Sequence, residues 1–406
     1  MEINTVSIKT KVSAGRILSG TLMIAGTTVG AGMLGIPLVT APAGFWPAAS
    51  ATALVWLFMM ATGLLFLEVA LWMPNETNIL SMACRFLGNK GKIVVGVMFA
   101  FLYYCLMVAY FAAGAPLVTG FFHTVLGMEL QGWTGCVLFA LIFGFVVALG
   151  VKSIDRTNII ITVAMAAAFV GLLGIGSGSV ETARWSFYNW TGAFVAIPVL
   201  FSAFGYHNVI PSLCTYLGRD RRVLTFSILF GTLIPLMMYL LWQWLIIGSI
   251  PQELILEAKA LGKPATTALQ SVSGSPWIYT LGQYFAFFAI VTSMLGVAFS
   301  MVDFLGDGLK IARNGLKRVF LTILTFLPPF LFAVLDPFIF DRALGVAGGI
   351  GEAFLNGILP VALVWIGKYN QDLPVNSRWL SARYTLAVLL IISLLVMFWE
   401  IISLLK

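Results

Sequence analysis

Two long apolar segments of the chain are interrupted in the same manner, and they occupy matching places in its two halves. The first interruption runs from Gly26 to Pro37 (GTTVGAGMLGIP), and the second runs from Phe201 to Pro211 (FSAFGYHNVIP). Glycines and a late proline both weaken an α-helix. Because freed backbone groups find no water in lipid, such a break persists only where it lines a cavity or is buried in protein. Paired breaks of this kind point to a binding site near the middle of a bilayer.

The composition supports a membrane protein and excludes a pair of soluble domains. Hydrophobic residues make up 60% of the 406 residues and charged residues only 10%, whereas soluble domains carry about 25% charged residues. With roughly 20 residues for each crossing, the sequence predicts an all-α integral membrane protein with eleven transmembrane helices. We expect these helices near residues 17–36, 42–70, 93–121, 133–150, 157–175, 191–216, 224–247, 277–305, 316–335, 342–367 and 383–404.

The basic residues are distributed unequally between the two sides of the predicted bundle. With the N-terminus in the cytoplasm, 18 of the 23 Lys and Arg residues fall on the cytoplasmic side. This distribution follows the positive-inside rule and predicts a multi-pass protein of the cell inner (plasma) membrane. An odd number of spans then places the C-terminus outside. The same distribution accounts for the net charge of +7 without a nucleic-acid partner.

The positions of the two breaks predict an internal repeat within a single transmembrane domain. Five spans that begin with a broken helix, residues 17–175, would be followed by five more, residues 191–367, that enter the membrane from the opposite side. The eleventh span, residues 383–404, is then an additional helix. The expected arrangement is a 5+5 inverted repeat with broken helices 1 and 6. In the longest outer loop, residues 248–276, we expect the segment Gln252–Leu261 to form a short surface helix.

The first break offers groups that suit a carboxylate. A short helix restarts after it, and the first amide groups of a helix lack partners within the helix and carry partial positive charge. Glycines at the break let a ligand approach the backbone, and threonines add hydroxyl groups. The residues predicted to bind the ligand here are Thr27, Thr28, Gly30, Ala31 and Gly32.

The second break offers the complementary charge. The half-helix that ends near Phe201 and Ser202 exposes carbonyl oxygens, which suit an ammonium group or a cation. A site with both features fits a zwitterion, so the predicted ligand is a free amino acid. Two other interpretations of the first break remain. The string from Gly30 to Gly35 matches the GxGxxG pattern of dinucleotide sites, which needs a βαβ unit, and Gly26 with Gly30 matches a helix-packing motif.

These segments resemble the signature sequences of a known family. The run from Gly26 to Pro37 is similar to the first-helix signature of the hydroxy and aromatic amino-acid permeases, and the run from Ser202 to Ser212 is similar to their sixth-helix signature. The segment FLPPF that begins at Phe326 resembles part of their ninth helix. The tyrosine and tryptophan permease branch is the most similar. The resemblance implies the leucine-transporter-like fold of the amino acid-polyamine-cation superfamily, and import of aromatic amino acids by cation-coupled symport.

Aromatic residues near the breaks are consistent with an aromatic substrate. Phe204 lies in the second break, and Tyr103, Tyr104 and Tyr110 lie on the third span. Aromatic rings pack favourably on offset or edge-on partners, although such residues also serve ordinary helix packing. His207 lies deep in the sixth span, where it can bond a phenol or indole, take up a proton near neutral pH, or brace the unwound backbone.

We expect a co-transported cation and no cofactor, and the sequence leaves the cation open between Na+ and H+. The family resemblance favours a proton. Thr292 and Ser293 form a hydroxyl pair midway along the eighth span, and such oxygen ligands suit sodium, although they can also bond to carbonyls of their own helix. The carboxylates Glu68 and Asp303, near the cytoplasmic ends of their spans, and Glu352, within the tenth span, are further candidates for ion coupling.

Other classes of function fit the sequence less well. The motifs HExxH and GxSxG are absent, which disfavours an intramembrane enzyme, and no GxxxxGK[ST] loop is present for an ATP-driven pump. The alternative that remains is a channel or symporter for another small neutral amino acid or zwitterion. We expect the protein to function as a monomer in membrane lipid, without a nucleic-acid partner.

Overall fold

The computed structural model describes residues 13–74, 77–261 and 265–405, and every regular element in these ranges is a helix. The predicted cytoplasmic segment at residues 1–12 lies outside the described residues. The first span consists of α1 (Ala14–Thr28) and α2 (Gly32–Thr40), and its two parts are bent by 54° at the break between them. The expected interruption of the first helix is therefore present.

The other four spans of the first half are α3 (Phe45–Trp72), α4 (Ile79–Leu126), α5 (Gly132–Leu149) and α6 (Val151–Gly176). Helix α4 begins well before the predicted start of the third span at residue 93. Its first turns are set apart by a kink at Gly88, which has a positive φ of 72°. Glycine adopts this conformation without the steric cost of a Cβ atom.

The second half contains the second broken span and a span with wide turns. Helices α7 (Trp190–Ala203) and α8 (Ile210–Tyr216) are separated by non-helical residues and the short turn η4 (His207–Val209). The tenth span combines α14 (Phe340–Val346), the π-helix η5 (Ala347–Ile358), α15 (Leu359–Trp365) and the π-helix η6 (Ile366–Asn370). The remaining spans are α9 (Arg221–Ser249), α12 (Pro276–Leu309), α13 (Gly315–Leu335) and α16 (Arg383–Leu405). With the first bent pair counted as one span, the described residues contain the eleven predicted spans.

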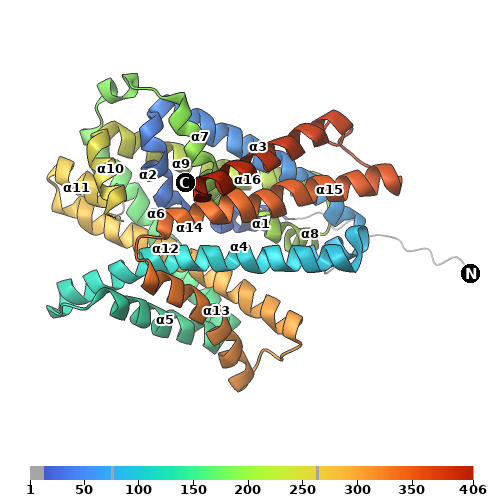
Figure 1. Cartoon of the computed structure of the whole chain (residues 1–406), viewed down its shortest axis with the longest axis horizontal. Helices are drawn as coiled ribbons and strands as arrows, with labels where there is room; N and C mark the ends of the chain where they lie inside the picture. Colours follow the sequence, from blue (N-terminus) through green and yellow to red (C-terminus); the bar gives the residue numbers. More distant parts are fainter. Residues whose placement is uncertain (1–12, 75–76, 262–264, 406) are drawn as a thin grey trace, which may run out of the picture.

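Short helices cover the end of the bundle that lies away from the N-terminus. Helix α10 (Gln252–Ala260) confirms the predicted surface helix, whereas α11 (Ala265–Ser273) was not expected from the sequence. Both lie together at the left of Figure 1, opposite the N-terminus. Three short 3₁₀ helices lie in the connections on this side: η1 (Ala41–Ala43), η2 (Ser177–Ser179) and η3 (Thr182–Ser186).

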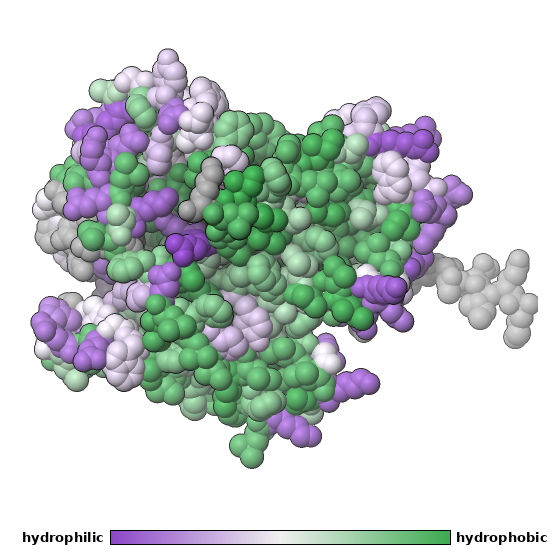
Figure 2. Space-filling view, viewed as in Figure 1, coloured by the Kyte–Doolittle hydropathy of each residue, from purple (hydrophilic) through white to green (hydrophobic). Residues whose placement is uncertain are grey.

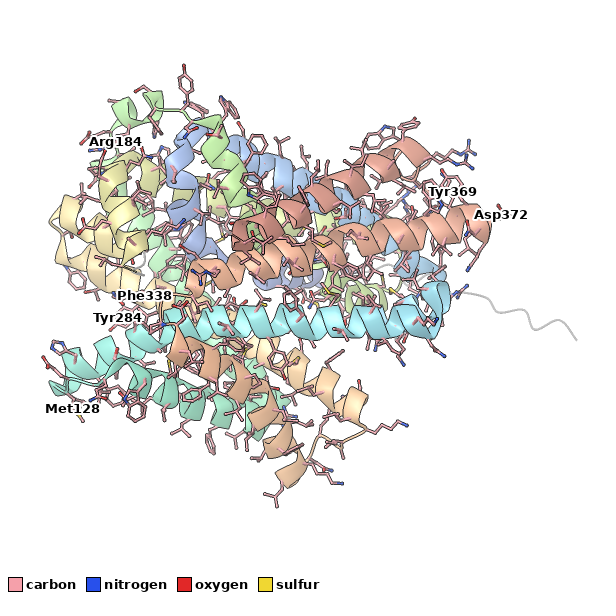
Figure 3. The ribbon with its side chains drawn as sticks, in the orientation of Figure 1. Met128, Arg184, Tyr284, Phe338, Tyr369 and Asp372 are labelled. Carbon is pink, nitrogen blue, oxygen red and sulfur yellow. The ribbon has the colours of Figure 1, made fainter. Side chains whose placement is uncertain are left out.

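The surface is arranged as expected for a protein surrounded by lipid. Hydrophobic residues cover the middle of the molecule, and hydrophilic residues gather toward its two ends (Figure 2). Met128 and Arg184, in connections after α4 and before α7, lie at one end, while Tyr369 and Asp372 lie at the other (Figure 3). Because helices that follow one another cross in alternate directions, connections with odd and even numbers gather at opposite ends.

Close packing of small residues holds the tenth span against the second broken span. A Cβ atom added to Gly348 of η5 would collide with the carbonyl oxygen of Pro198 and would lie 2.6 Å from the amide nitrogen of Ser202. The two backbones therefore touch, which only glycine permits at this point. Helix α12 packs against α6 and α4, and together these elements enclose the region in which both breaks lie.

Candidate substrate and ion site

The two breaks are in direct contact with each other. A Cβ atom added to Gly32, at the start of α2, would lie 3.0 Å from Cα of Ala203, at the end of α7. Ordinary carbon contacts are about 3.5–4.0 Å, so a side chain at residue 32 would push the breaks apart. The amino end of one half-helix and the carboxyl end of another thus meet at one place, as a site for a zwitterion requires.

Tyr239 of α9 joins the two breaks, and the sequence alone gave no signal for its role. Its hydroxyl lies 2.7 Å from the carbonyl oxygen of Thr28 and 2.8 Å from that of Ala203. The side chain is fully buried, and its ring packs against Phe204 at a centroid distance of 5.0 Å. One hydroxyl group therefore lies within hydrogen-bonding distance of carbonyl oxygens at the ends of both α1 and α7.

A cavity of about 600 Å³ lies beside the breaks, between α1, α4, α6, α7, α12 and η5. It is large enough for an amino acid and combines apolar walls with polar groups, as ligand sites usually do. Most of the residues predicted from the sequence line this cavity. They are Thr27, Thr28, Gly30, Ala31, Gly32, Ser202, Thr292, Ser293 and Glu352.

Three aromatic side chains predicted to bind the substrate lie elsewhere, because helix packing turns them away from the cavity. Tyr104 donates a hydrogen bond to the carbonyl oxygen of Leu324 on α13, at 3.0 Å. Phe201 is buried against Phe58 of α3, with ring centroids 5.0 Å apart. Phe204 is buried against α9. None of these three side chains is part of the cavity lining.

His207 also lies outside the cavity lining. Its imidazole is fully buried, and Nε2 is 3.0 Å from Oγ1 of Thr62 on α3. The neighbouring Tyr206 donates from its hydroxyl to the carbonyl oxygen of Met59 at 3.2 Å. These contacts tie the unwound segment to α3.

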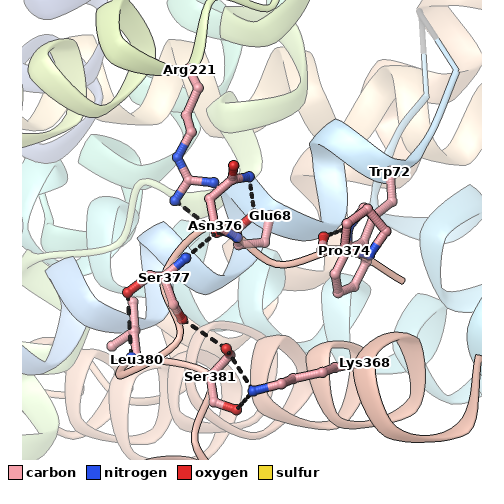
Figure 4. A network of polar contacts seen from close by, with 9 residues as sticks. All are labelled: Glu68, Trp72, Arg221, Lys368, Pro374, Asn376, Ser377, Leu380 and Ser381. Atoms are coloured by element: carbon pink, nitrogen blue, oxygen red, sulfur yellow. Dashed lines mark hydrogen bonds and ion pairs between the residues drawn. The ribbon is translucent and has the colours of Figure 1, made fainter. Parts of the chain in front are cut away.

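Glu68 lies at the end of the bundle where α3 ends and α9 begins. Its carboxylate pairs with Arg221 at 2.7 Å and accepts hydrogen bonds from the amide nitrogens of Asn376 and Ser377 at 3.2 and 3.3 Å (Figure 4). Nδ2 of Asn376 donates to it as well, at 3.1 Å. Glu68 thereby fastens the segment between η6 and α16 to two spans, at a distance from the cavity lining.

Asp303 near the end of α12 pairs with Arg313 at 3.4 Å, and Arg313 also contacts Asp307. Arg16 of α1 pairs with neither Glu68 nor Asp303 among the described residues, and it donates to the carbonyl oxygen of Tyr216 and lies over its ring. Asp303 therefore belongs to a local ion-pair group at the end of the bundle, and it is not part of the cavity lining.

The hydroxyl pair on α12 faces the first break. Oγ of Ser293 accepts a hydrogen bond from the amide nitrogen of Ala31 at 3.1 Å, and a Cβ atom at Gly30 would collide with it. Thr292 donates within its own helix, to the carbonyl oxygens of Phe288 and Ala289 at 3.0 and 3.1 Å. Both residues line the cavity. Thr292 thus bonds to carbonyls of its own helix, whereas Ser293 contacts the first break.

Glu352 brings a carboxylate into the cavity from the π-helix η5. It is buried, accepts a hydrogen bond from the side chain of Asn356, and lies so close to Gly205 that a Cβ atom there would collide with it. In the part of the chain that the structure describes, no ion pair joins Glu352 to a lysine or arginine. A carboxylate at this depth needs a proton or a cation to offset the cost of its burial.

The structure distinguishes the three tyrosines of the third span and adds further cavity residues. Tyr103 and Tyr110 line the cavity from α4, whereas Tyr104, the one predicted to bind the substrate, does not. Asn208 reaches it from the second break, and Gly296 and Ser300 reach it from α12. Because Gly296 and Ser300 follow Ser293 at intervals of three and seven residues, the helical period could have placed them on the same face.

Comparison with known proteins agrees with this architecture. The model of the Tryptophan/tyrosine permease family matches residues 13–400. The tyrosine-specific transport system 1 of Haemophilus influenzae is 32% identical over 388 residues, which cover 94% of this chain and 95% of that protein. The tryptophan-specific transport protein of Pseudomonas aeruginosa is 30% identical over 388 residues, which cover 92% of each.

A solved structure shows the same fold. The crystal structure of MhsT in complex with L-phenylalanine matches with a TM-score of 0.63 at 15% identity, over 94% of this chain and 98% of that one. The predicted leucine-transporter-like fold, a 5+5 inverted repeat with broken helices 1 and 6 and one additional helix, is therefore confirmed. The family consists of permeases and not of enzymes. With a family match that extends over nearly its whole length, the chain belongs to the tryptophan/tyrosine permease family.

Proposed function

We propose that the protein imports an aromatic amino acid, tyrosine or tryptophan, by cation-coupled symport with alternating access. The observation that carries this proposal is the direct contact of the two breaks beside a cavity of about 600 Å³. The names of the relatives supply the substrate class, because they are tyrosine-specific and tryptophan-specific transport proteins.

In this proposal, main-chain groups bind the two charges of the substrate. The backbone at Gly30 and Gly32 receives the carboxylate at the amino end of α2, on either side of the Ala31 amide that donates to Ser293. The helix dipole there favours negative charge. The carbonyl groups at Phe201 and Ser202 receive the ammonium group at the carboxyl end of α7. Main-chain recognition of this kind needs no charged side chain, so the site accepts the constant part of any amino acid.

We propose Na+ at Thr292 and Ser293 as the coupling ion, since both hydroxyl-bearing residues line the cavity beside the first break and oxygen ligands suit this cation. H+ carried by Glu352 is the second candidate, favoured by the burial of that carboxylate beside the second break. The remaining parts of the proposal are a location in the cell inner (plasma) membrane, a cytoplasmic N-terminus, an external C-terminus and function as a monomer.

Uptake of radiolabelled tyrosine into proteoliposomes tests this function. An imposed gradient of Na+ or of H+, applied separately, should drive accumulation above the external concentration, with tyrosine or tryptophan as the effective competitors. Equilibration without accumulation under either gradient would indicate a channel. Failure of every aromatic amino acid to enter, by a protein that is folded in detergent, would refute the proposal.

Variants separate the two candidate ions. If Na+ binds to the hydroxyl pair, Thr292→Ala with Ser293→Ala should remove the stimulation by Na+. Glu352→Gln should instead remove the stimulation by a pH gradient if this residue carries H+. Thr325→Ala is the matched control, because its buried hydroxyl also donates within its own helix, at 2.9 Å, but lies outside the cavity lining.

A further inference from the structure

Helices α4 and α12 line the cavity with hydroxyl groups at two levels. At the first level are Tyr110 and Ser293, and Ser293 also accepts a hydrogen bond from the amide nitrogen of Ala31 at the first break. At the second level are Tyr103 and Ser300. On each helix the two levels are seven residues apart, which corresponds to about 10 Å along an α-helix.

The second level contains a third polar group, which comes from the other break. Nδ2 of Asn208 donates a hydrogen bond to the Tyr103 hydroxyl at 3.0 Å, and the Asn208 side chain is otherwise exposed to the cavity. A phenol can accept two hydrogen bonds and donate one. With Asn208 as its donor, Tyr103 keeps its own proton for an oxygen atom in the cavity, the Asn208 side-chain carbonyl remains as an acceptor, and the Ser300 hydroxyl lines the same level.

The cavity wall between the two levels is apolar and open. A Cβ atom added to Gly296 would meet nothing within 4 Å, so this part of the α12 wall is open. Leu106 of α4 and Val297 of α12 line the same stretch, and we call the space beside them the slot. Phe99, one turn before Tyr103, also lines the cavity, and its ring stacks on that of Tyr103 at 4.2 Å. Aromatic side chains at the wall pack favourably against an aromatic ring of a ligand.

We propose that this slot receives the substrate's aromatic ring and that Tyr103, Asn208 and Ser300 hydrogen-bond the phenol hydroxyl of tyrosine. This inference rests on the proposed function, because the first level marks where the charged end of an amino acid would bind. Tyrosine is an elongated molecule with its hydroxyl at the far end from its charged groups, and the two levels are separated along the same direction. The three residues of the second level would thus determine which aromatic amino acid the site prefers.

The expected consequence is a preference for tyrosine over phenylalanine. Phenylalanine would fill the same slot but would leave the polar groups of the second level without the partner that tyrosine supplies. Sites built to hydrogen-bond a substrate hydroxyl reject analogues that lack it, because their own polar groups then remain unpaired.

The test compares competition for labelled tyrosine uptake by unlabelled tyrosine and phenylalanine, in the parent protein and in Tyr103→Phe and Asn208→Ala. The ratio of the two inhibition constants should favour tyrosine in the parent and should fall by about threefold to tenfold in each variant, as expected for loss of one hydrogen bond. Tyr104→Phe is the matched control, because it removes a neighbouring hydroxyl that bonds to Leu324 outside the cavity lining, and its ratio should equal that of the parent.

The outcomes separate this inference from the proposed function. An unchanged ratio in both variants, or an equal fall in Tyr104→Phe, would overturn the specificity role while leaving aromatic uptake established. A parent that does not distinguish tyrosine from phenylalanine would overturn it as well. Absence of any aromatic uptake by the parent would refute the proposed function itself. If one variant does not fold, Ser300→Ala removes a hydroxyl from the same level, and an unchanged ratio there would count equally against the inference.

Discussion

The contact between Gly32 and Ala203 yields a quantitative prediction for the joined breaks. In Gly32→Ala, the new Cβ atom would lie 3.0 Å from Cα of Ala203, whereas carbon atoms in contact prefer about 3.5–4.0 Å. The breaks must therefore separate by a few tenths of an ångström. Overpacking of this kind costs about 1–3 kcal/mol, which corresponds to roughly a 5- to 150-fold rise in KM if the strain falls on the bound state. Gly32→Val adds two further carbons and should abolish uptake.

Labelled tyrosine uptake, normalised to the amount of folded protein measured by size-exclusion chromatography, provides the assay. Gly174→Ala is the internal control, because a Cβ atom at that residue of α6 meets nothing within 4 Å and the residue lies outside the cavity lining. That variant should retain uptake. Normal KM and maximal rate in Gly32→Val would refute the reasoning, since the breaks could then not be packed as closely as the structure indicates. Equal losses in Gly174→Ala and Gly32→Ala would refute it as well, because the effect would not depend on the contact.

Two further predictions concern groups outside the cavity lining. Thr62→Val removes the hydrogen-bond partner of His207 Nε2. It should lower the free energy of unfolding by about 1–3 kcal/mol, the cost of an unpaired buried polar group, and leave KM and substrate preference unchanged. A changed substrate preference would instead place His207 in substrate recognition. Glu68→Gln weakens the bonds to Arg221 and to the 371–382 segment. It should lower the free energy of unfolding by about 1–2 kcal/mol. A thermal unfolding temperature equal to that of the parent would argue against a role of Glu68 in holding this segment.

The sequence predicts the spans and their breaks because both depend on local composition. Long apolar runs must cross the bilayer, and glycines with a late proline interrupt a helix wherever they occur. Backbone participants such as Gly30 and Gly32 could therefore be placed in the cavity from the sequence. Helix α11 could not be predicted from the sequence, because its residues have neither the length nor the apolar character of a span. Its position depends on packing against α10 and α12.

The rotation of a helix about its own axis is the main property that the sequence leaves undetermined. Tyr103 and Tyr104 are neighbours, and neighbouring residues of an α-helix point about 100° apart. Both faces of α4 are apolar, so no pattern of hydrophobicity indicates which tyrosine faces the cavity. The same uncertainty affects the second break, where Phe204 and His207 turn toward α9 and α3. Tertiary packing decides these orientations.

The hydroxyl of Tyr239 has a consequence for movement of the half-helices. It carries one proton, yet two carbonyl oxygens, those of Thr28 and Ala203, lie within bonding distance of it. If one half-helix moves away, the Tyr239 hydroxyl can donate its proton to the carbonyl oxygen of the other half-helix. The movement therefore costs less than the loss of a full hydrogen bond. Through Tyr239, helix α9 can thus remain hydrogen-bonded to one half-helix while the other one moves.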